Sequence, residues 1–218
     1  SAAISGGNTI ASPSFKEKDG TLKRFDFVVA NPPFSVKNWT SGINPMDDEF
    51  NRFRGYGIPP DKNGDYAFLL HIISSLNKSG KGAVILPHGV LFRGNAEADI
   101  RQNILERKWI KGIIGLPANL FFGTGIPAAI LIFNRGKGDN TDVFFVDASQ
   151  CYESAKNQNR LRLEEDINPI VESYEQFNQG QLQAGVIKEK YSYVATFDEI
   201  AENDFNLNIP RYVDTFEE

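Results

Sequence analysis

The sequence has very little cysteine: Cys151 is the only one in 218 residues. No disulfide can therefore form within the chain, and no secretory signal peptide is recognisable, so the sequence predicts a cytoplasmic protein. The two histidines, His71 and His88, belong to no Cys/His cluster, so no metal site is expected. No apolar run approaches the roughly 20 residues of a membrane-spanning helix, so no membrane contact is expected.

An excess of positive charge is also missing. Lys and Arg number 23 against 28 Asp and Glu, which gives a net charge of -5 and a pI near 5.2. A free-standing nucleic-acid-binding protein is usually basic. If DNA is the substrate, a local patch or a partner protein must therefore supply the phosphate contacts. The length suffices for one core, so one domain with an appended segment is expected.

Strand and helix patterns alternate along the first 150 residues. Apolar, β-favouring runs predict strands, and helical spacing of apolar residues predicts helices between them. The predicted strands cover residues 25–30, 83–86, 109–115, 128–134 and 142–146, and the predicted helices cover residues 66–78 and a segment after Asn95. This alternation is typical of an α/β fold, here a partial Rossmann-like domain with a mixed, mostly parallel sheet and flanking helices.

Local signals set the expected ends of these elements. Asp65 and Asn95 are predicted N-caps, and Gly80 is predicted to end the first helix. Only a short Gly-rich turn separates the last two strands, so they are expected to form an antiparallel edge. Residues 150–218 are expected to form a C-terminal α/β extension, whose predicted elements are helices at 163–178 and 197–202 and a strand at 191–194.

The tetrapeptide Asn31-Pro32-Pro33-Phe34 follows the first strand, which is predicted to be buried. Two prolines fix the backbone, the Asn carboxamide offers an acceptor, and the Phe ring offers a flat face. These groups suit a planar heterocycle that carries an exocyclic amine. The alternative is that the prolines only make a tight exit from the strand.

Other candidate residues carry weaker signals. Phe121 and Phe122 are candidates for the opposite wall of such a pocket, although each taken singly is more often a core residue. The long loop at residues 35–63 contains four cations that are candidates for DNA phosphate contacts or for a solvated surface: Lys37, Arg52, Arg54 and Lys62. His88 is expected to have a structural role in its loop, and His71 to be a core histidine.

The tetrapeptide resembles motif IV of adenine-N6 DNA methyltransferases. The flanking segments resemble modification subunits of type I restriction–modification systems, and the similarity runs from about residue 20 to residue 213. The segments that carry it are residues 67–76, 82–92, 114–117, 119–127, 156–161 and 203–212.

This resemblance implies methyl transfer from S-adenosylmethionine to an extruded adenine in double-stranded DNA. It assigns Asn31, Pro32 and Phe34 to catalysis, and Pro33, Phe121, Phe122 and Lys37 to substrate binding. It also implies a specificity subunit and a restriction subunit as partners. In such subunits the cofactor is held mainly by an upstream half with a Gly-rich loop, which is not found here.

Asn8 stands where the family often has an acidic residue near the cofactor's adenine, so it is the candidate cofactor-binding residue. Residues 1–149 are accordingly expected to be the target-adenine half of the methyltransferase domain, inactive without the remainder. Two alternatives remain: an RNA or protein-glutamine methyltransferase with a similar loop, and a non-catalytic fragment that docks partners.

Overall fold

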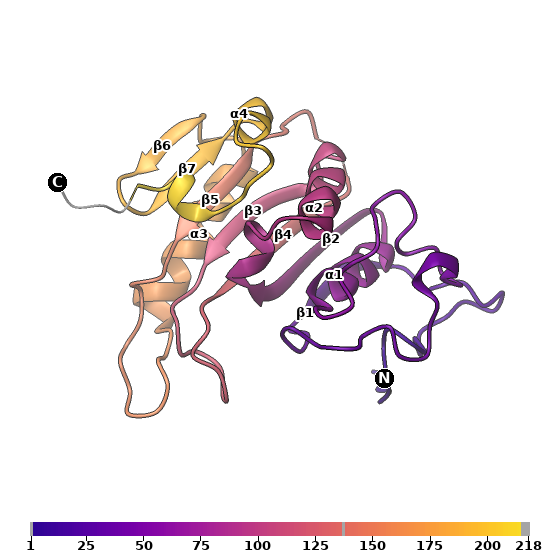
Figure 1. The fold of residues 1–218 in the computed structure, drawn as a ribbon. Coiled ribbons are helices and arrows are strands. Elements are labelled where there is room, and N and C mark those ends of the chain that lie inside the picture. Colours follow the sequence, from indigo (N-terminus) through magenta and orange to yellow (C-terminus); the bar gives the residue numbers. More distant parts are fainter. Residues whose placement is uncertain (1, 137, 215–218) are drawn as a thin grey trace.

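Seven strands form a single mixed sheet in the order β1-β2-β4-β3-β5-β7-β6 in the computed structural model, which describes residues 2–136 and 138–214 (Figure 1). The strands are β1 (Phe25–Ala30), β2 (Leu76–Pro87), β3 (Ile110–Gly115), β4 (Ala128–Asn134), β5 (Val143–Asp147), β6 (Gly185–Lys188) and β7 (Ser192–Ala195). The helices are α1 (Asp65–Ser74), α2 (Ala96–Glu106), α3 (Asn168–Asn178) and α4 (Phe197–Glu202). The α/β class and the mixed sheet are as predicted.

Five strands share one direction, as predicted for a mostly parallel sheet, and only β4 and β7 run against them. Because each of these two lies between strands of the opposite direction, four of the six pairings are antiparallel, and only β1 with β2 and β3 with β5 pair in parallel. The expected antiparallel edge between β4 and β5 is wrong, because β4 lies between β2 and β3 and β5 lies between β3 and β7. The cause is the link from β3 to β4, which contains no helix and therefore returns the chain antiparallel.

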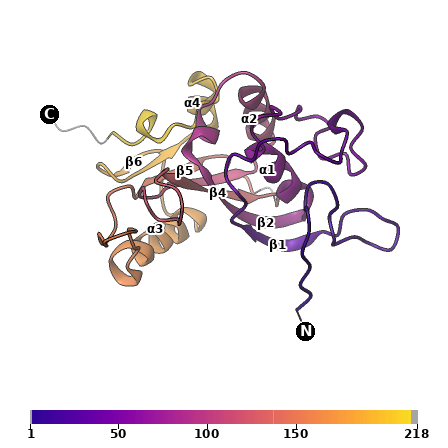
Figure 2. The same ribbon diagram turned by 60° about the horizontal axis from the view of Figure 1, so that its bottom comes forward.

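Helices cover the sheet unevenly (Figure 2). The helices α1, α2 and α4 lie on one face over the larger core, to which Ile72, Ile104 and Ile200 contribute. Helix α3 covers the other face over β3 and β5 through Ile170 and Phe177. Among the described residues, no helix covers that second face beneath β1 and β2.

Helix α1 is shorter than predicted. It ends at Ser74, and β2 begins at Leu76, which pairs with Phe25 of β1. Gly80 therefore lies inside a strand and does not end a helix. A Cβ at Gly80 would lie 3.0 Å from the carbonyl oxygen of Phe25, so the close approach of the two strands requires glycine there.

One of the two predicted caps is wrong, and the other is right in position only. The N-cap position of α1 is Gly64, and Asp65 is the first helical residue and is completely buried. Asn95 does occupy the N-cap of α2, with φ 55°, but its side chain makes no cap hydrogen bond. The carboxylate of Asp65 is instead used in a contact with the candidate site, described below.

The segment beyond residue 150 joins the same sheet. Strand β7 pairs with β5 and carries β6, which the sequence did not predict because Gly185 indicated a break. The predicted helix at 163–178 begins as a π turn at Leu163–Ile167 and continues as α3, while α4 is as predicted. Tyr212 stacks on Phe145 of β5 with ring centroids 4.1 Å apart. The division between residues 149 and 150 stays a prediction.

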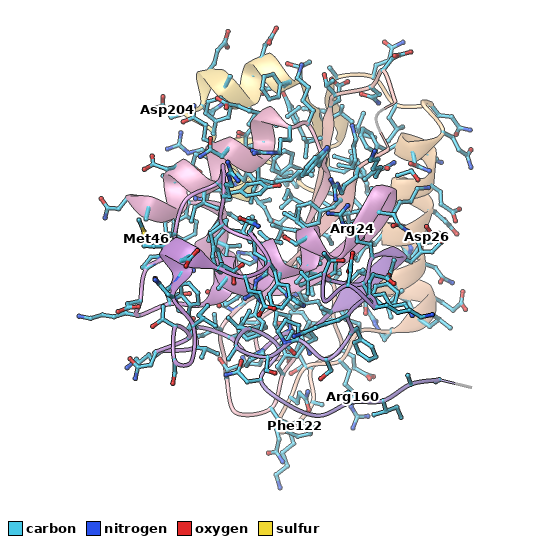
Figure 3. All side chains as sticks on the ribbon, turned by 90° about the vertical axis from the view of Figure 1, so that its right-hand side faces the viewer. Arg24, Asp26, Met46, Phe122, Arg160 and Asp204 are labelled. Atoms are coloured by element: carbon cyan, nitrogen blue, oxygen red, sulfur yellow. The ribbon has the colours of Figure 1, made fainter. Side chains whose placement is uncertain are left out.

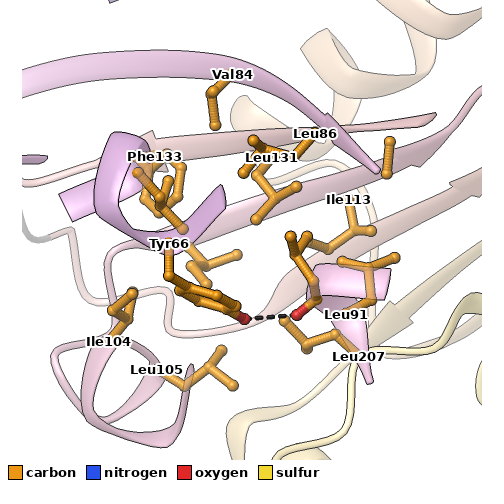
Figure 4. Packing of buried hydrophobic residues seen from close by; sticks show 14 of the residues in the cluster. Tyr66, Val84, Leu86, Leu91, Ile104, Leu105, Ile113, Leu131, Phe133 and Leu207 are labelled. Atoms are coloured by element: carbon orange, nitrogen blue, oxygen red, sulfur yellow. Dashed lines mark hydrogen bonds between the residues drawn. The ribbon is translucent and has the colours of Figure 1, made fainter. Parts of the chain in front are cut away.

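The larger core packs directly behind the edge at which β2 ends (Figure 4). Tyr66 lies within it, and its hydroxyl donates to the carbonyl of Val90 at 2.5 Å. Burial raises the pKa of Tyr66 to about 12, so the hydroxyl keeps its proton. This bond fixes the short turn that follows β2.

Strand β1 is exposed, although the sequence predicted a buried strand. Within the described residues it pairs with β2 alone, so its other edge is open. Phe27 is 75% exposed and Val29 is 81% exposed on the face without a helix, whereas Val28 and Ala30 pack against the larger core. No helix among the described residues has the length and hydropathy to cross a membrane.

Candidate active site

The strand registers bring several chain segments to one edge of the sheet. Ala30 of β1 pairs with Val84, three residues before the end of β2, and Pro87 at that end pairs with Ala128 at the start of β4. Gly115 at the end of β3 pairs with Ala129. The segment at residues 31–34 and the loop at 116–127 therefore emerge at the same edge.

These two segments line a broad, solvent-open cavity of about 570 Å³. Phe34 and Phe121 are in edge-to-face contact in its lining, with ring centroids 5.6 Å apart and planes at 79°. The residues lining the cavity are Asn31, Pro32, Pro33, Phe34, Phe121, Phe122 and Thr124. Six of the eight site residues expected from the sequence thus come together.

Asn31 is free to meet a ligand. Its side chain is exposed, and no described residue hydrogen-bonds to its carboxamide or to the carbonyl of Pro32. Two acceptors of different kinds therefore lie at adjacent positions, on a corner whose φ angles the prolines hold. The arrangement can accept both hydrogens of a planar amine.

The two remaining candidates, Lys37 and Asn8, do not line the cavity. Lys37 is exposed in the loop that follows the tetrapeptide. The Oδ1 atom of Asn8 accepts the N–H groups of Ile10 and Ala11, both at 3.0 Å, so its carboxamide is already used to form a turn. Their roles as substrate-binding and cofactor-binding residues stay predictions.

The two phenylalanines of the loop differ in their surroundings. Phe121 is half-buried against Phe34, and Phe122 is 89% exposed at the tip of the loop. Neither belongs to a core cluster, so the alternative that both are core aromatics is wrong. Phe122 projects at the same end of the molecule as Arg160 (Figure 3).

A buried ionic group that the sequence did not reveal supports the tetrapeptide side of the cavity. The N–H of Ser35, directly after Phe34, donates to Oδ1 of Asp65 at 2.7 Å. Arg93 donates to the other oxygen of Asp65 and to Glu97, both at 2.7 Å. Burial raises the pKa of Glu97 above its ordinary value, although Arg93 opposes this. The only sequence signal for this group is Asp65 at the start of a predicted helix, a position that indicates an N-cap.

One of the four cations proposed for DNA contacts is unsuitable. Arg52 is 1% exposed and pairs with Asp48 at 2.6 Å. It also donates to the carbonyl of Ile10 at 2.8 Å and lies 3.3 Å from Nδ1 of His71. Arg52 therefore anchors the long loop to the core, and the hypothesis that it meets phosphate is wrong. The other three cations, Lys37, Arg54 and Lys62, are exposed.

The region around Asn8 does not form a pocket that fits S-adenosylmethionine. The strand before the candidate pocket continues into two prolines and has no Gly-rich loop. The cavity near Asn8 holds only about 90 Å³, below the roughly 300 Å³ at which ligand pockets begin. In the described part of the chain, no group of three or more His, Cys, Asp or Glu side chains is placed to hold a metal ion.

Comparison with known proteins gives a consistent set of relatives. A family model described as N-6 DNA Methylase matches residues 1–218. The methylase subunit of the type I restriction enzyme HindI from Haemophilus influenzae is 34% identical over 209 residues, which cover 94% of this chain and 45% of that protein. The methylase subunit of MjaIX from Methanocaldococcus jannaschii is 32% identical over 193 residues, which cover 87% and 35%.

Solved structures that resemble this chain also include methyltransferase subunits of type I restriction–modification systems. The type I restriction–modification methyltransferase subunit from Streptococcus thermophilus is 42% identical with a TM-score of 0.82, over 95% of this chain and 41% of that one. The M protein of the type I enzyme EcoKI is 21% identical with a TM-score of 0.68, over 97% and 47%, which is a similarity of fold. The chain spans less than half the length of each of these relatives.

Proposed function

Because this chain belongs to the N-6 DNA methylase family, we propose that the protein containing it transfers a methyl group from S-adenosylmethionine to N6 of adenine in DNA. The observation that carries this proposal is the cavity in which an unengaged Asn31 carboxamide lies beside a diproline corner and two aromatic rings. The cofactor would supply an electrophilic methyl group.

Asn31 and Pro32 prepare the nucleophile. The adenine amine is weakly nucleophilic, because its lone pair is delocalised into the ring. Acceptance of its two hydrogens by the Asn31 oxygen and the Pro32 carbonyl shifts the nitrogen towards tetrahedral geometry and localises the lone pair. No covalent enzyme intermediate is needed, which agrees with the position of Cys151 outside the cavity.

The aromatic residues hold the base. Phe34 stacks on one face of the base, and Phe121, which touches the edge of Phe34, and Phe122 border the cavity beside it. The base must leave the duplex to enter, at a cost of a few kcal/mol that stacking offsets in part. The exposed ring of Phe122 is placed to meet the extruded nucleotide first.

The intact protein supplies what this chain lacks. The cofactor site is proposed to include polypeptide outside the described residues, so the chain alone is expected to be inactive. The open edge of β1 and the exposed Phe27 and Val29 give further polypeptide a place to extend the sheet and cover its second face. A net charge of -5 agrees with DNA affinity supplied by a specificity subunit, with a restriction subunit as the further partner.

The decisive experiment compares Asn31→Ala with the wild type in the intact subunit and its specificity partner. N6-methyladenine formed in duplex DNA is expected to fall by at least about 100-fold. Asn178→Ala, at an exposed position of α3, is the matched control and is expected to retain full activity. Undiminished methylation by Asn31→Ala rejects the proposal. If the protein methylates RNA or a glutamine-containing peptide in preference to DNA, that acceptor is the substrate and DNA is not.

A further inference from the structure

The loop that carries Phe121 is held by two side chains from a distant segment. Three consecutive carbonyls of this loop each receive one donor. Asn159 donates through its Nδ2 atom to Ala118 at 2.9 Å and through its backbone N–H to Asn119 at 2.8 Å. Gln158 donates through its Nε2 atom to Leu120. These contacts join positions about 40 residues apart in the sequence.

The supporting segment is itself well anchored. Glu153 and Arg160 exchange two backbone hydrogen bonds, of 2.8 and 3.0 Å, which close a hairpin around the two donors. Just beyond it, the guanidinium of Arg162 donates twice to the carboxylate of Asp166, both at 2.9 Å, and that carboxylate is buried. Gln158 and Asn159 therefore project from a fixed base.

The supported loop has few other connections to the sheet. The N–H of Leu116 donates to Ala128 at 2.8 Å, and Pro127 accepts from His88 at 3.2 Å, both near the ends of the loop. Between these ends the backbone of Asn119 has φ 57°, in the left-handed region that asparagine adopts more readily than most non-glycine residues. The three bonded carbonyls lie immediately before Phe121.

We propose that Gln158 and Asn159 are positioning residues that hold Phe121 against the edge of Phe34 and so fix the aromatic side of the cavity that an extruded base enters. This inference rests on the proposed function and assigns to residues 158–159 a role in setting the shape of the pocket. The two side chains act through the backbone of the loop and do not line the cavity themselves. A wall displaced by about 1 Å misorients the base and is expected to slow the chemical step by about 10- to 100-fold.

The test uses Gln158→Glu and Asn159→Asp in the intact subunit with its specificity partner. Each change keeps the size of the side chain but removes its N–H donors, so a carboxylate faces a carbonyl. Asn157→Asp adds the same charge at the exposed neighbouring position and is the control. The first two variants should lower kcat by about 10- to 100-fold with less than about 3-fold change in the dissociation constant for DNA, and the control should match the wild type.

Two further measurements separate positioning from general damage. With 2-aminopurine at the target adenine, the fluorescence of the bound complex should report a changed environment of the extruded base in Gln158→Glu and Asn159→Asp. In a background of Phe121→Ala, both substitutions should lose most of their effect on kcat, because the wall they support is absent. Unchanged kcat in both variants, or effects that simply add to that of Phe121→Ala, overturns the inference.

A failure of this inference is distinguishable from a failure of the proposed function. If Asn31→Ala abolishes methylation while Gln158→Glu and Asn159→Asp behave as Asn157→Asp, the reaction is supported and the positioning role is rejected. If wild-type protein does not methylate adenine, both proposals fail together.

Discussion

The backbone N–H of Ser35 donates to a carboxylate oxygen of Asp65 at 2.7 Å. Ser35 has φ 51° and directly follows the proposed catalytic tetrapeptide, while Asp65 is the first residue of α1 and is completely buried. One hydrogen bond therefore connects the catalytic corner to the helix that packs behind the sheet. Arg93 occupies the other oxygen of Asp65, so both acceptors of the carboxylate have partners.

Substitution of Asp65 should destabilise the fold. Asp65→Ala leaves the Ser35 N–H without its acceptor and removes one of the two carboxylates that Arg93 binds, and the free energy of unfolding is expected to fall by about 3 kcal/mol. Asp65→Asn can still accept from Ser35, so it should lose less. Urea denaturation of the two variants measures the difference.

Asp139→Asn is the control for these variants, since Asp139 is exposed and its substitution should change stability by less than about 0.5 kcal/mol. Equal stability of Asp65→Ala and wild type would show that the Ser35 contact does not contribute.

His71 should make stability depend on pH. Burial and the nearby charge of Arg52 lower its pKa from 6.5 to about 4. Between these values the unfolded chain binds a proton that the folded chain does not, so the free energy of unfolding should decrease as the pH falls through this window. His71→Asn should show a smaller decrease in denaturation midpoint between pH 7 and pH 5.

Neighbouring groups set the background for that comparison. Burial lowers the pKa of His88 as well, so His71→Asn should reduce the slope without removing it. Burial raises the pKa of Asp48, but the bonds from Arg52 outweigh it and leave the pKa below 3.8, outside the window. Identical slopes for His71→Asn and wild type would contradict the assignment.

Phe122 should matter for activity and not for stability. Because its ring is 89% exposed, Phe122→Ala is expected to change the free energy of unfolding by less than about 0.5 kcal/mol. The loss of its contact with the extruded base should lower kcat/KM by about 5- to 100-fold, which corresponds to a stacking contribution of about 1–3 kcal/mol. Parallel assays of methylation and thermal unfolding test both expectations, and full activity of Phe122→Ala would remove Phe122 from the site.

Charged substitutions on the exposed face of β1 should have different effects in residues 1–218 alone and in the intact protein. We expect the open edge and the exposed Phe27 and Val29 to make residues 1–218 self-associate, and Phe27→Lys with Val29→Lys to reduce this with little change in stability, because both side chains are exposed. In the intact protein the same pair should lower the free energy of unfolding by about 2 kcal/mol or more, since two charges would be buried. Sedimentation measures the self-association of residues 1–218, and denaturation measures the stability of the intact protein. If the two substitutions leave the stability of the intact protein unchanged, this face of β1 stays uncovered there.

The features that were predictable from the sequence are those with local signals. The strand before Asn31 and the rigid corner after it follow from an apolar run and two prolines, and the pocket they imply is present. The exposure of that strand was not predictable, because whether Phe27 is covered depends on polypeptide packed from elsewhere. A half-exposed strand at the edge of a sheet and a fully buried strand can have the same apolar composition, so composition alone does not distinguish them.

Long-range order and polar contacts were missed for a physical reason. The position of β4 between β2 and β3 depends on where the chain turns after Gly115, and periodicity carries no information about that. Asp65 and Asn159 looked like ordinary cap and loop residues, because their partners, Ser35 and Ala118, are 30 and 41 residues away. Hydrogen bonds between such distant positions have no sequence signature.

Strand β4 runs antiparallel to both of its neighbours, so residues 116–127 leave the sheet and return to it within its central strands. Both attachment points lie within the paired strands, so the segment between them can be exchanged as a unit. Grafting this stretch from a homologue, with the matching hairpin at 153–160, is expected to reshape the proposed nucleotide-accepting surface and to leave the strand scaffold intact.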